Sequence, residues 1–236
     1  MRLSIAADLF RRFGLILLLA TLWQAQAQDS KTTYSSMPPL DQYLMERNAE
    51  IDLARTAAPP SISQDAQVMV FGKHGYENAV SGKNGFVCLV MRGWTAAFTD
   101  PVFSDPTIRG PVCLNPAAVR SFLPVVLRKA EMVAAGRSKE QMAHSITAAL
   151  STKELPPIEP GAMSFMLSRQ GNLGNGIGSW HPHLMFFTPL SEAGTWGGGL
   201  PGSPIIEAKD ETAQVITFLI PVRKWSDGTF DVPEKH

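Results

Sequence analysis

Several short apolar runs along the chain have the pattern of β-strands. Runs of alternating or continuous apolar residues, several of them β-branched, are typical of half-buried or fully buried strands. They fall at residues 66–71, 77–80, 86–92, 162–168, 181–187, 205–208 and 214–220. Between the second and third runs, Asn84-Gly85 is the strongest local signal for a hairpin turn. This part of the chain therefore predicts an antiparallel hairpin or meander.

Helical patterns occupy other parts of the chain. Residues 41–56 carry apolar side chains at helical spacing, and Pro59-Pro60 ends the pattern. Asn115-Pro116 is a typical helix start, and the helix predicted from there to about residue 135 is interrupted by Pro124. The capping box Ser138-Lys139-Glu140-Gln141 predicts another helix, which ends near residue 154.

These elements together predict the fold class. Strands, then two central helices, then strands again are typical of an α+β domain and do not repeat a βαβ unit. We expect a single domain over residues 41–236, with a mainly antiparallel sheet and two or three helices. A flexible polar segment over residues 28–40 precedes it, and a long proline-interrupted loop spans residues 94–111.

The first 27 residues have the order of a secretory signal peptide. Arg2, Arg11 and Arg12 form a positive region, residues 13–22 form an apolar run, and Ala25-Gln26-Ala27 is a small-x-small cleavage site. The apolar run is shorter than a membrane span, which favours cleavage over an N-terminal membrane anchor. We therefore expect an exported protein, periplasmic or extracellular, with no transmembrane anchor after cleavage.

Composition narrows the class of partner. The 236 residues carry 21 basic and 21 acidic side chains, a formal net charge of 0, and 44% of the residues are hydrophobic. Removal of residues 1–27, which hold three arginines and one aspartate, takes the net charge to about −2. A near-neutral chain lacks the basic face that nucleic-acid binding needs. The partners we expect are a small-molecule ligand or an extracytoplasmic protein.

Cys88 and Cys113 are the only two cysteines of the chain. An even cysteine count in an exported chain predicts a disulfide, and the alternative is a pair of buried free thiols. A Cys88–Cys113 bridge would also pin the loop at residues 94–111. A cysteine nucleophile is disfavoured, because an oxidising compartment consumes free thiolates.

His181-Pro182-His183 is the densest group of chemically useful side chains. Pro182 excludes the helical region for His181, and alternate residues of an extended chain face the same way. Both imidazoles should then leave one face, with Cα atoms roughly 6–7 Å apart, close enough to share one metal. Because proline cannot donate to a ladder, we place the pair at a strand mouth or sheet edge.

A metal site at this pair needs a third ligand. The sequence offers His74, Glu77 and Glu207, of which His74, between two predicted strands, fits best. Mixed histidine and carboxylate ligation suits Zn or another divalent transition metal, and Glu77 could instead act as general base on a metal-bound water. Two alternatives stay open: metal-free histidines that bind a ligand or act in catalysis, and structural histidines bonded to nearby carbonyls.

The remaining features are less specific. The glycines of residues 171–178 predict a rim or tight turn and lack the full spacing of a dinucleotide-binding pattern. Trp94, Trp180, Trp196 and Trp225 fall in predicted loops, where they could meet a partner or anchor the loop to the core.

Three segments together resemble exported bacterial proteins of uncharacterised function: Pro157-Ile158-Glu159-Pro160-Gly161-Ala162-Met163, Trp180-His181-Pro182-His183-Leu184-Met185-Phe186 and Lys224-Trp225-Ser226-Asp227-Gly228. The similarity covers about residues 50–229. It implies secretion and a single domain, and it implies no particular reaction.

Three functions are consistent with these patterns. The first is an exported protein with a ligand- or metal-binding site at the His-Pro-His strand mouth. The second is a metal-dependent hydrolase with Glu77 as base. The third is a protein-interaction module that uses the tryptophan-bearing loops.

Overall fold

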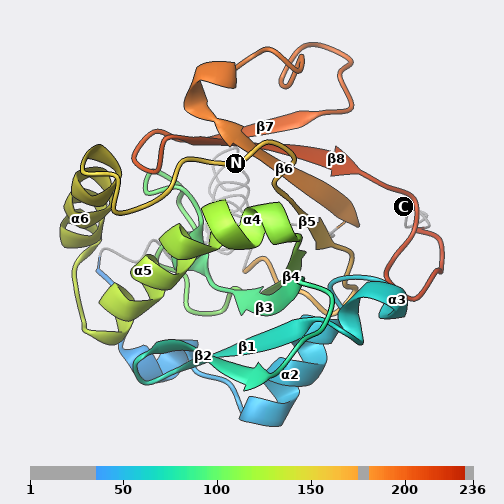
Figure 1. The fold of residues 1–236 in the computed structure, drawn as a ribbon, viewed down its shortest axis with the longest axis horizontal. Coiled ribbons are helices and arrows are strands. Elements are labelled where there is room, and N and C mark those ends of the chain that lie inside the picture. The colour runs from blue at the N-terminus through green and yellow to red at the C-terminus, as the bar shows by residue number, and fades with distance from the viewer. Residues whose placement is uncertain (1–35, 175–180, 232–236) are drawn as a thin grey trace, which may run out of the picture. The chain divides into compact units, whose positions relative to one another are not determined.

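The structure is a computed structural model that describes residues 36–174 and 181–231 of the chain (Figure 1). The predicted signal peptide, most of the segment at 28–40, Trp180 and most of the glycine-rich stretch at 171–178 lie outside those residues. At the start of the described part, Met37 and Leu40 pack against the main hydrophobic core. Within these two ranges, no helix combines the length and apolar character that crossing a bilayer requires.

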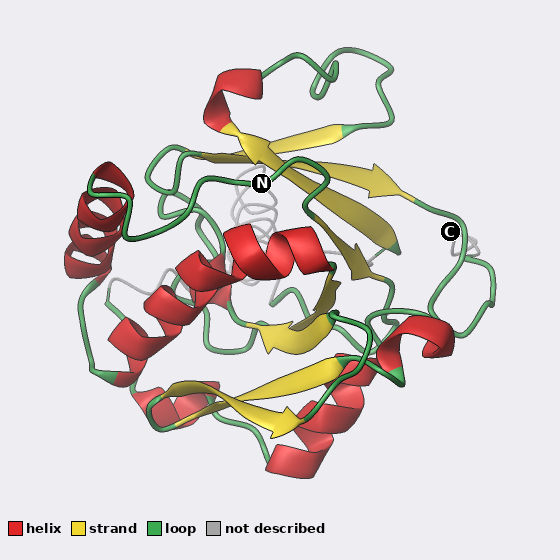
Figure 2. Cartoon of the chain, viewed as in Figure 1, coloured by secondary structure: helices red, strands yellow, loops and turns green. Residues whose placement is uncertain are grey.

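The described residues form one eight-stranded sheet with helices against it, which confirms the predicted α+β class (Figure 2). The strand order is β2-β1-β3-β4-β5-β6-β8-β7, and every neighbouring pair is antiparallel except β1 and β3, which are parallel. The strands are β1 (Gln67–Gly72), β2 (Gly75–Val80), β3 (Val87–Met91), β4 (Gly110–Leu114), β5 (Met163–Met166), β6 (His183–Pro189), β7 (Ile206–Asp210) and β8 (Val215–Pro221).

The helices outnumber the two or three that we predicted. The described part holds five α-helices, α2 (Arg47–Arg55), α3 (Pro60–Ser63), α4 (Pro116–Ser121), α5 (Leu123–Ala134) and α6 (Lys139–Ser151), and the 3-10 helices η1 (Leu40–Tyr43), η2 (Gly93–Thr95) and η3 (Leu190–Glu192).

Local chemistry explains most of the difference in helix number. The helical pattern at 41–56 divides because Glu46 caps α2 by accepting from the backbone N–H groups of Asn48 and Ala49. The pattern after Asn115 divides into α4 and α5 at Phe122, just before Pro124, whose ring nitrogen cannot donate to the preceding turn. The capping box at Ser138 and Gln141 begins α6 as predicted.

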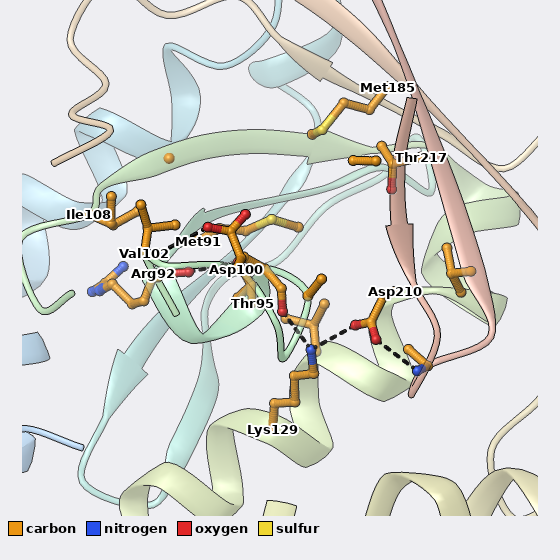
Figure 3. Close-up of a pocket in the computed structure, with 18 of the residues that line it drawn as sticks. Met91, Arg92, Thr95, Asp100, Val102, Ile108, Lys129, Met185, Asp210 and Thr217 are labelled. Atoms are coloured by element: carbon orange, nitrogen blue, oxygen red, sulfur yellow. Dashed lines mark hydrogen bonds and ion pairs between the residues drawn. The ribbon is translucent and has the colours of Figure 1, made fainter. Parts of the chain in front are cut away.

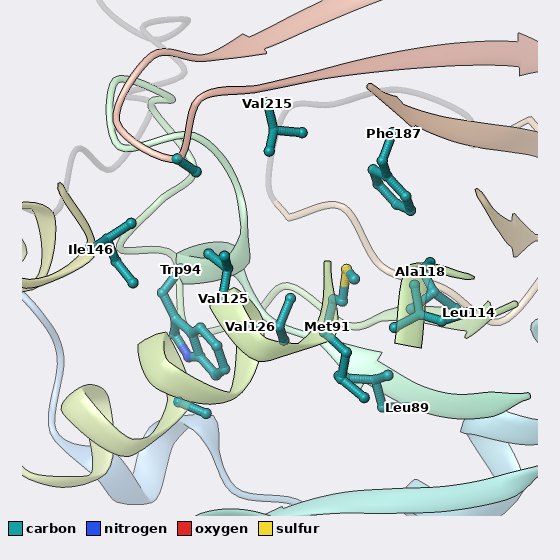
Figure 4. Packing of buried hydrophobic residues seen from close by; sticks show 14 of the residues in the cluster. Leu89, Met91, Trp94, Leu114, Ala118, Val125, Val126, Ile146, Phe187 and Val215 are labelled. Atoms are coloured by element: carbon teal, nitrogen blue, oxygen red, sulfur yellow. The ribbon is translucent and has the colours of Figure 1, made fainter. Parts of the chain in front are cut away.

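The central strand β3 is buried on both faces, which sets the layers of the domain. Val87, Leu89 and Met91 face the larger core, to which α5 and α6 contribute (Figure 4). Cys88 and Val90 face the opposite way, into a smaller cluster covered by α2. Because successive strand residues point to opposite faces, a continuous apolar run was required at this position.

Cys88 and Cys113 form a disulfide between β3 and β4. The two residues lie directly opposite each other in the antiparallel register, with Cα atoms 4.0 Å apart. They belong to the smaller cluster under α2. Closing a loop of this length stabilises the fold by roughly 3 kcal/mol on the chain-entropy model.

We predicted a hairpin turn at Asn84-Gly85, and this prediction was wrong. The hairpin lies one connection earlier, where β1 and β2 meet at Gly72 and Gly75, and β3 instead joins the other side of β1 in parallel. Residues 81–86 cross back beside β1, where a Cβ on Gly82 would lie 2.1 Å from the backbone nitrogen of Gln67. The Asn84 amide donates to the carbonyl of Ile62 and serves this crossing.

The strand β4 was not predicted at all. We expected residues 94–111 to form a loop that leads directly into the helix at Asn115. Pro111 made a central strand improbable, since proline cannot donate to a ladder. In the structure it lies opposite Val90, and pairing with β3 and β5 on either side holds the strand in place.

Candidate functional site

A cavity of about 490 Å³ lies between the sheet and α5 (Figure 3). Its walls come from the end of β3 and the loop that follows it, from α5, from β6 and β8, and from the turn between β7 and β8. Most of the lining is apolar, and three methionines, Met91, Met166 and Met185, supply flexible thioether side chains. The cavity therefore collects residues that are more than 100 positions apart in the sequence.

Lys129 of α5 is a deeply buried charged side chain in the cavity wall. Its side chain is 2% exposed. The Nζ donates to the carbonyl of Ala96 at 2.9 Å, lies 3.3 Å from Oδ2 of Asp210, and sits 4.3 Å from the centre of the Phe98 ring. Burial lowers the pKa of Lys129 below its ordinary value of 10.5, and the attraction of Asp210 opposes this shift. The amine is therefore easier to deprotonate than a surface lysine.

Asp210 ends β7 and is held by the turn that it begins. Its Oδ1 accepts hydrogen bonds from the backbone N–H groups of Thr212 and Ala213, at 3.1 and 3.0 Å. This leaves Oδ2 to face Lys129 (Figure 3). The ion pair thus connects α5 to the turn between β7 and β8 at one end of the cavity.

Few other polar side chains line the cavity. Asp100 lies in the loop after η2, and its Oδ1 accepts from the backbone N–H of Val102 at 3.0 Å. Thr95 donates its hydroxyl to the carbonyl of Arg92, and Thr217 of β8 faces the cavity. A mainly apolar wall with a small number of placed polar groups is the usual make-up of a small-molecule site.

His183, the first residue of β6, also lines the cavity. Its Nδ1 lies 2.8 Å from the carbonyl oxygen of His181. Burial lowers the pKa of His183 below its ordinary value of 6.5, while the hydrogen bond to the His181 carbonyl opposes the shift. The start of β6, where we predicted a strand mouth, therefore borders the cavity, and His183 is the histidine of the pair that lines it.

His181 has a different neighbour. Its Nδ1 lies 2.7 Å from Oδ2 of Asp231, and its side chain is 58% exposed. The ring therefore interacts with the C-terminal segment of the described chain, and it is not among the residues that line the cavity.

The structure does not bring His74 and Glu77 to the histidine pair. His74 lies in the turn between β1 and β2, and Glu77 lies on β2, where it pairs with Arg47 at the protein surface. Four strands separate β2 from β6 in the sheet, so the two sets are on the order of 20 Å apart. Glu77 consequently cannot act as base on a water held by His181 and His183.

The other proposed ligand, Glu207, is also engaged elsewhere. It pairs with Lys209 on the same strand and accepts from the backbone N–H of Gly194. Among residues 36–174 and 181–231, no three His, Cys, Asp or Glu side chains are grouped so that they could hold a metal ion.

The tryptophans mostly serve the core. Trp94 is fully buried and Trp225 is nearly so. Trp196 is 37% exposed and stacks on Phe218 with ring centres 4.7 Å apart. Of the three described tryptophans, one is therefore placed to meet a partner.

The cavity and the Lys129–Asp210 pair were missed by our sequence analysis. One signal was present: Lys129 falls on the same helical stripe as the buried Val126, Ala130 and Val133. A lysine at a core position of an amphipathic helix needs a buried partner. Nothing in the local sequence around Asp210 identifies it as that partner.

Comparison of the chain with models of protein families, with curated proteins and with solved structures found no match.

The lowered pKa of His183 predicts a pH dependence of stability. Between the folded pKa and 6.5 the unfolded chain binds more protons at this site, so stability is lost as the pH falls through the folded pKa. The His183→Asn variant should therefore lose less stability than the wild type between about pH 7.5 and about pH 5, as measured by urea unfolding. The matched control is His74→Asn, which makes the same substitution in the exposed β1–β2 turn, away from the cavity. Equal slopes in His183→Asn and the wild type would contradict the prediction.

Proposed function

We propose that this is an exported protein that binds a small, mainly apolar molecule in the cavity bordered by α5, β6 and β8. The observation that supports it is the cavity itself. Its volume of about 490 Å³ falls within the range of roughly 300–1,000 Å³ that is usual for small-molecule sites. Export is supported by the signal-like order of residues 1–27 and by the Cys88–Cys113 disulfide.

The cavity is partly open to the protein surface and is larger than the voids usually found inside protein cores. Protein interiors are packed to the density of organic crystals, and few contain voids larger than a water molecule. Here the surrounding core is well filled, with Phe187, Val126 and Val215 buried close to the cavity wall (Figure 4). A hollow of this size beside a well-filled core is a candidate site for a ligand.

The wall indicates the general character of the ligand. Met91, Met166 and Met185 offer apolar, flexible contact, which suits ring or chain hydrocarbons of varied shape. The charge of Lys129 is already paired with that of Asp210. A charged group on the ligand would be buried without a partner, which is costly. A ligand that is largely uncharged fits this environment.

Binding of the neutral fluorescent probe N-phenyl-1-naphthylamine tests the proposal. We expect a saturable rise in its emission at one probe per protein, because the dye leaves water for the apolar cavity. Thr217→Phe places a ring inside the cavity and should weaken binding about tenfold or more. Ile220→Phe is the matched control, since it adds the same ring to the same strand on the opposite face. No saturable binding by the wild type, or wild-type affinity in Thr217→Phe, would overturn the proposal.

A further inference from the structure

Lys129 places a primary amine in the wall of an apolar cavity. The side chain is 2% exposed, and Figure 3 shows it rising from α5 with its nitrogen close to Asp210. Placing a lysine here costs desolvation energy, and an apolar residue of similar volume would avoid that cost. The amine is therefore a candidate for a chemical role, as buried lysines beside apolar ligands can act as nucleophiles.

The surroundings of the amine are suited to reversible proton transfer. Within the described chain, Nζ has two acceptors, the Ala96 carbonyl at 2.9 Å and Asp210 Oδ2 at 3.3 Å. The ammonium group also lies 4.3 Å from the centre of the Phe98 ring. The lowered pKa of Lys129 makes transfer of a proton to Asp210 easier than at a solvated lysine.

We propose that Lys129 captures an apolar aldehyde or ketone in this cavity as an imine. This inference rests on the proposed ligand-binding function and names the chemical class of the ligand. An apolar body satisfies the methionine-rich walls, and the carbonyl carbon meets the amine.

The reaction balances without any oxidant or reductant. Asp210 takes one proton from the Lys129 ammonium, and the freed electron pair forms a C–N bond to the carbonyl carbon. A second proton moves from nitrogen to the former carbonyl oxygen, Asp210 returns its proton there, and the C–O bond breaks to release water. The product is a protonated imine with the same single positive charge as the ammonium.

That conserved charge favours the imine at this position. Asp210 is held by the N–H groups of Thr212 and Ala213, so it stays beside the nitrogen before and after the reaction. The ion pair between α5 and the β7–β8 turn is therefore kept in the product. A carboxylate ligand would instead compete with Asp210 for the same cation and leave a surplus negative charge in the cavity.

Reductive trapping tests the inference directly. The protein is mixed with 3-phenylpropanal and sodium cyanoborohydride at about pH 7, where ordinary lysines are almost fully protonated. The modified lysines are then located by peptide mass spectrometry. We expect Lys129 to be labelled about tenfold faster than the exposed Lys83 and Lys153. Labelling of Lys129 at or below the rate of these two lysines would overturn the inference.

Two further measurements tie the reaction to the cavity. Saturating N-phenyl-1-naphthylamine should slow labelling of Lys129 and leave Lys83 unaffected; labelling without such protection would place the reaction outside the cavity and contradict the inference. Lys129→Arg should lose the fast adduct. The matched control Lys139→Arg, in the first turn of α6 and outside the cavity wall, should keep it.

The two proposals fail separately. Saturable probe binding by the wild type without selective labelling of Lys129 would remove the imine and leave the proposed function intact. Absence of probe binding would remove the proposed function, and the imine inference with it.

Discussion

Replacing Arg92 with methionine is expected to lower the free energy of unfolding by about 3–5 kcal/mol. Arg92 and Glu50 are both almost completely buried, with Nη2 and Oε2 2.9 Å apart. Arg92 also donates to the carbonyls of Tyr43 and Val90. Loss of the guanidinium would leave a buried carboxylate without its cation, and that leftover charge makes the change costly.

The pH dependence of the same variant follows from Glu50. Burial raises its pKa above the ordinary value of 4.5, and Arg92 opposes the shift, so removing Arg92 raises the pKa further. A raised folded pKa contributes stability that is full below the unfolded pKa and is lost as the pH rises. The deficit of Arg92→Met should therefore be largest near neutral pH and shrink on acidification, as urea unfolding at the two conditions would measure.

Two matched variants separate the buried charge from other effects of the substitution. Adding Glu50→Gln to Arg92→Met should recover much of the lost stability, because the amide oxygen can still accept from the backbone N–H of Phe71. Arg120→Met breaks an exposed pair with Glu159, which water and salt screen, and should cost far less than Arg92→Met. A cost for Arg92→Met as small as that for Arg120→Met would show that the buried pair is not important for stability.

Replacing Trp94 with alanine should cost about 3–5 kcal/mol of unfolding free energy. Trp94 lies in η2 and has no exposed surface. Its ring packs against Phe71 and Tyr76, with centres 5.3 and 5.9 Å away. Alanine would leave a void among aromatic side chains that are themselves held by the sheet.

Phenylalanine at the same position gives the sharper comparison. The indole Nε1 of Trp94 is buried and has no hydrogen-bond partner among the described residues. An unmet buried donor costs about 1–3 kcal/mol, so Trp94→Phe removes a penalty together with part of the packing. We expect its loss in chemical denaturation to be less than half that of Trp94→Ala. Equal losses for the two variants would mean that the N–H is satisfied in solution.

Both sites lie where the cavity wall begins. Arg92 follows the last residue of β3 directly. Gly93 of η2 fits against the carbonyl of Val102, where a Cβ would lie 2.3 Å from that oxygen. The loop from Thr95 to Val102 then forms one side of the cavity. Rigid packing beneath the loop thus holds the wall that carries Asp100 and the Ala96 carbonyl.

Short-range signals in the sequence predicted much of the fold. The capping box at Ser138, the Asn115 cap followed by Pro116, and the interruption at Pro124 each depend on contacts within one helical turn. The apolar runs marked most strands for a similar reason, because burial on one or both faces leaves a periodic record along the chain. The α+β class followed from the order of these elements.

Long-range pairing could not be obtained in the same way. Whether β3 joins β2 or β1 depends on the crossing at Gly82, which fits against Gln67, and not on the turn signal at Asn84-Gly85. The strand β4 forms, despite Pro111, because it pairs with β3 on one side and with β5 on the other. Propensity describes a residue and its neighbours, and neighbours in space can override it.

For the candidate site, too, local sequence predicted one part and tertiary packing decided the other. Extended geometry around Pro182 was enough to point to His183 at a strand mouth, since it needs only alternation along one strand. The sheet order then separated His74 and Glu77 from His183 by four strands, and no local pattern contains that order. The apposition of Lys129 on α5 with Asp210 at the end of β7, 81 residues away, arises where the packed helix and the last hairpin meet over the cavity. Local sequence can place a side chain on a face, but only packing in three dimensions selects what lies across from it.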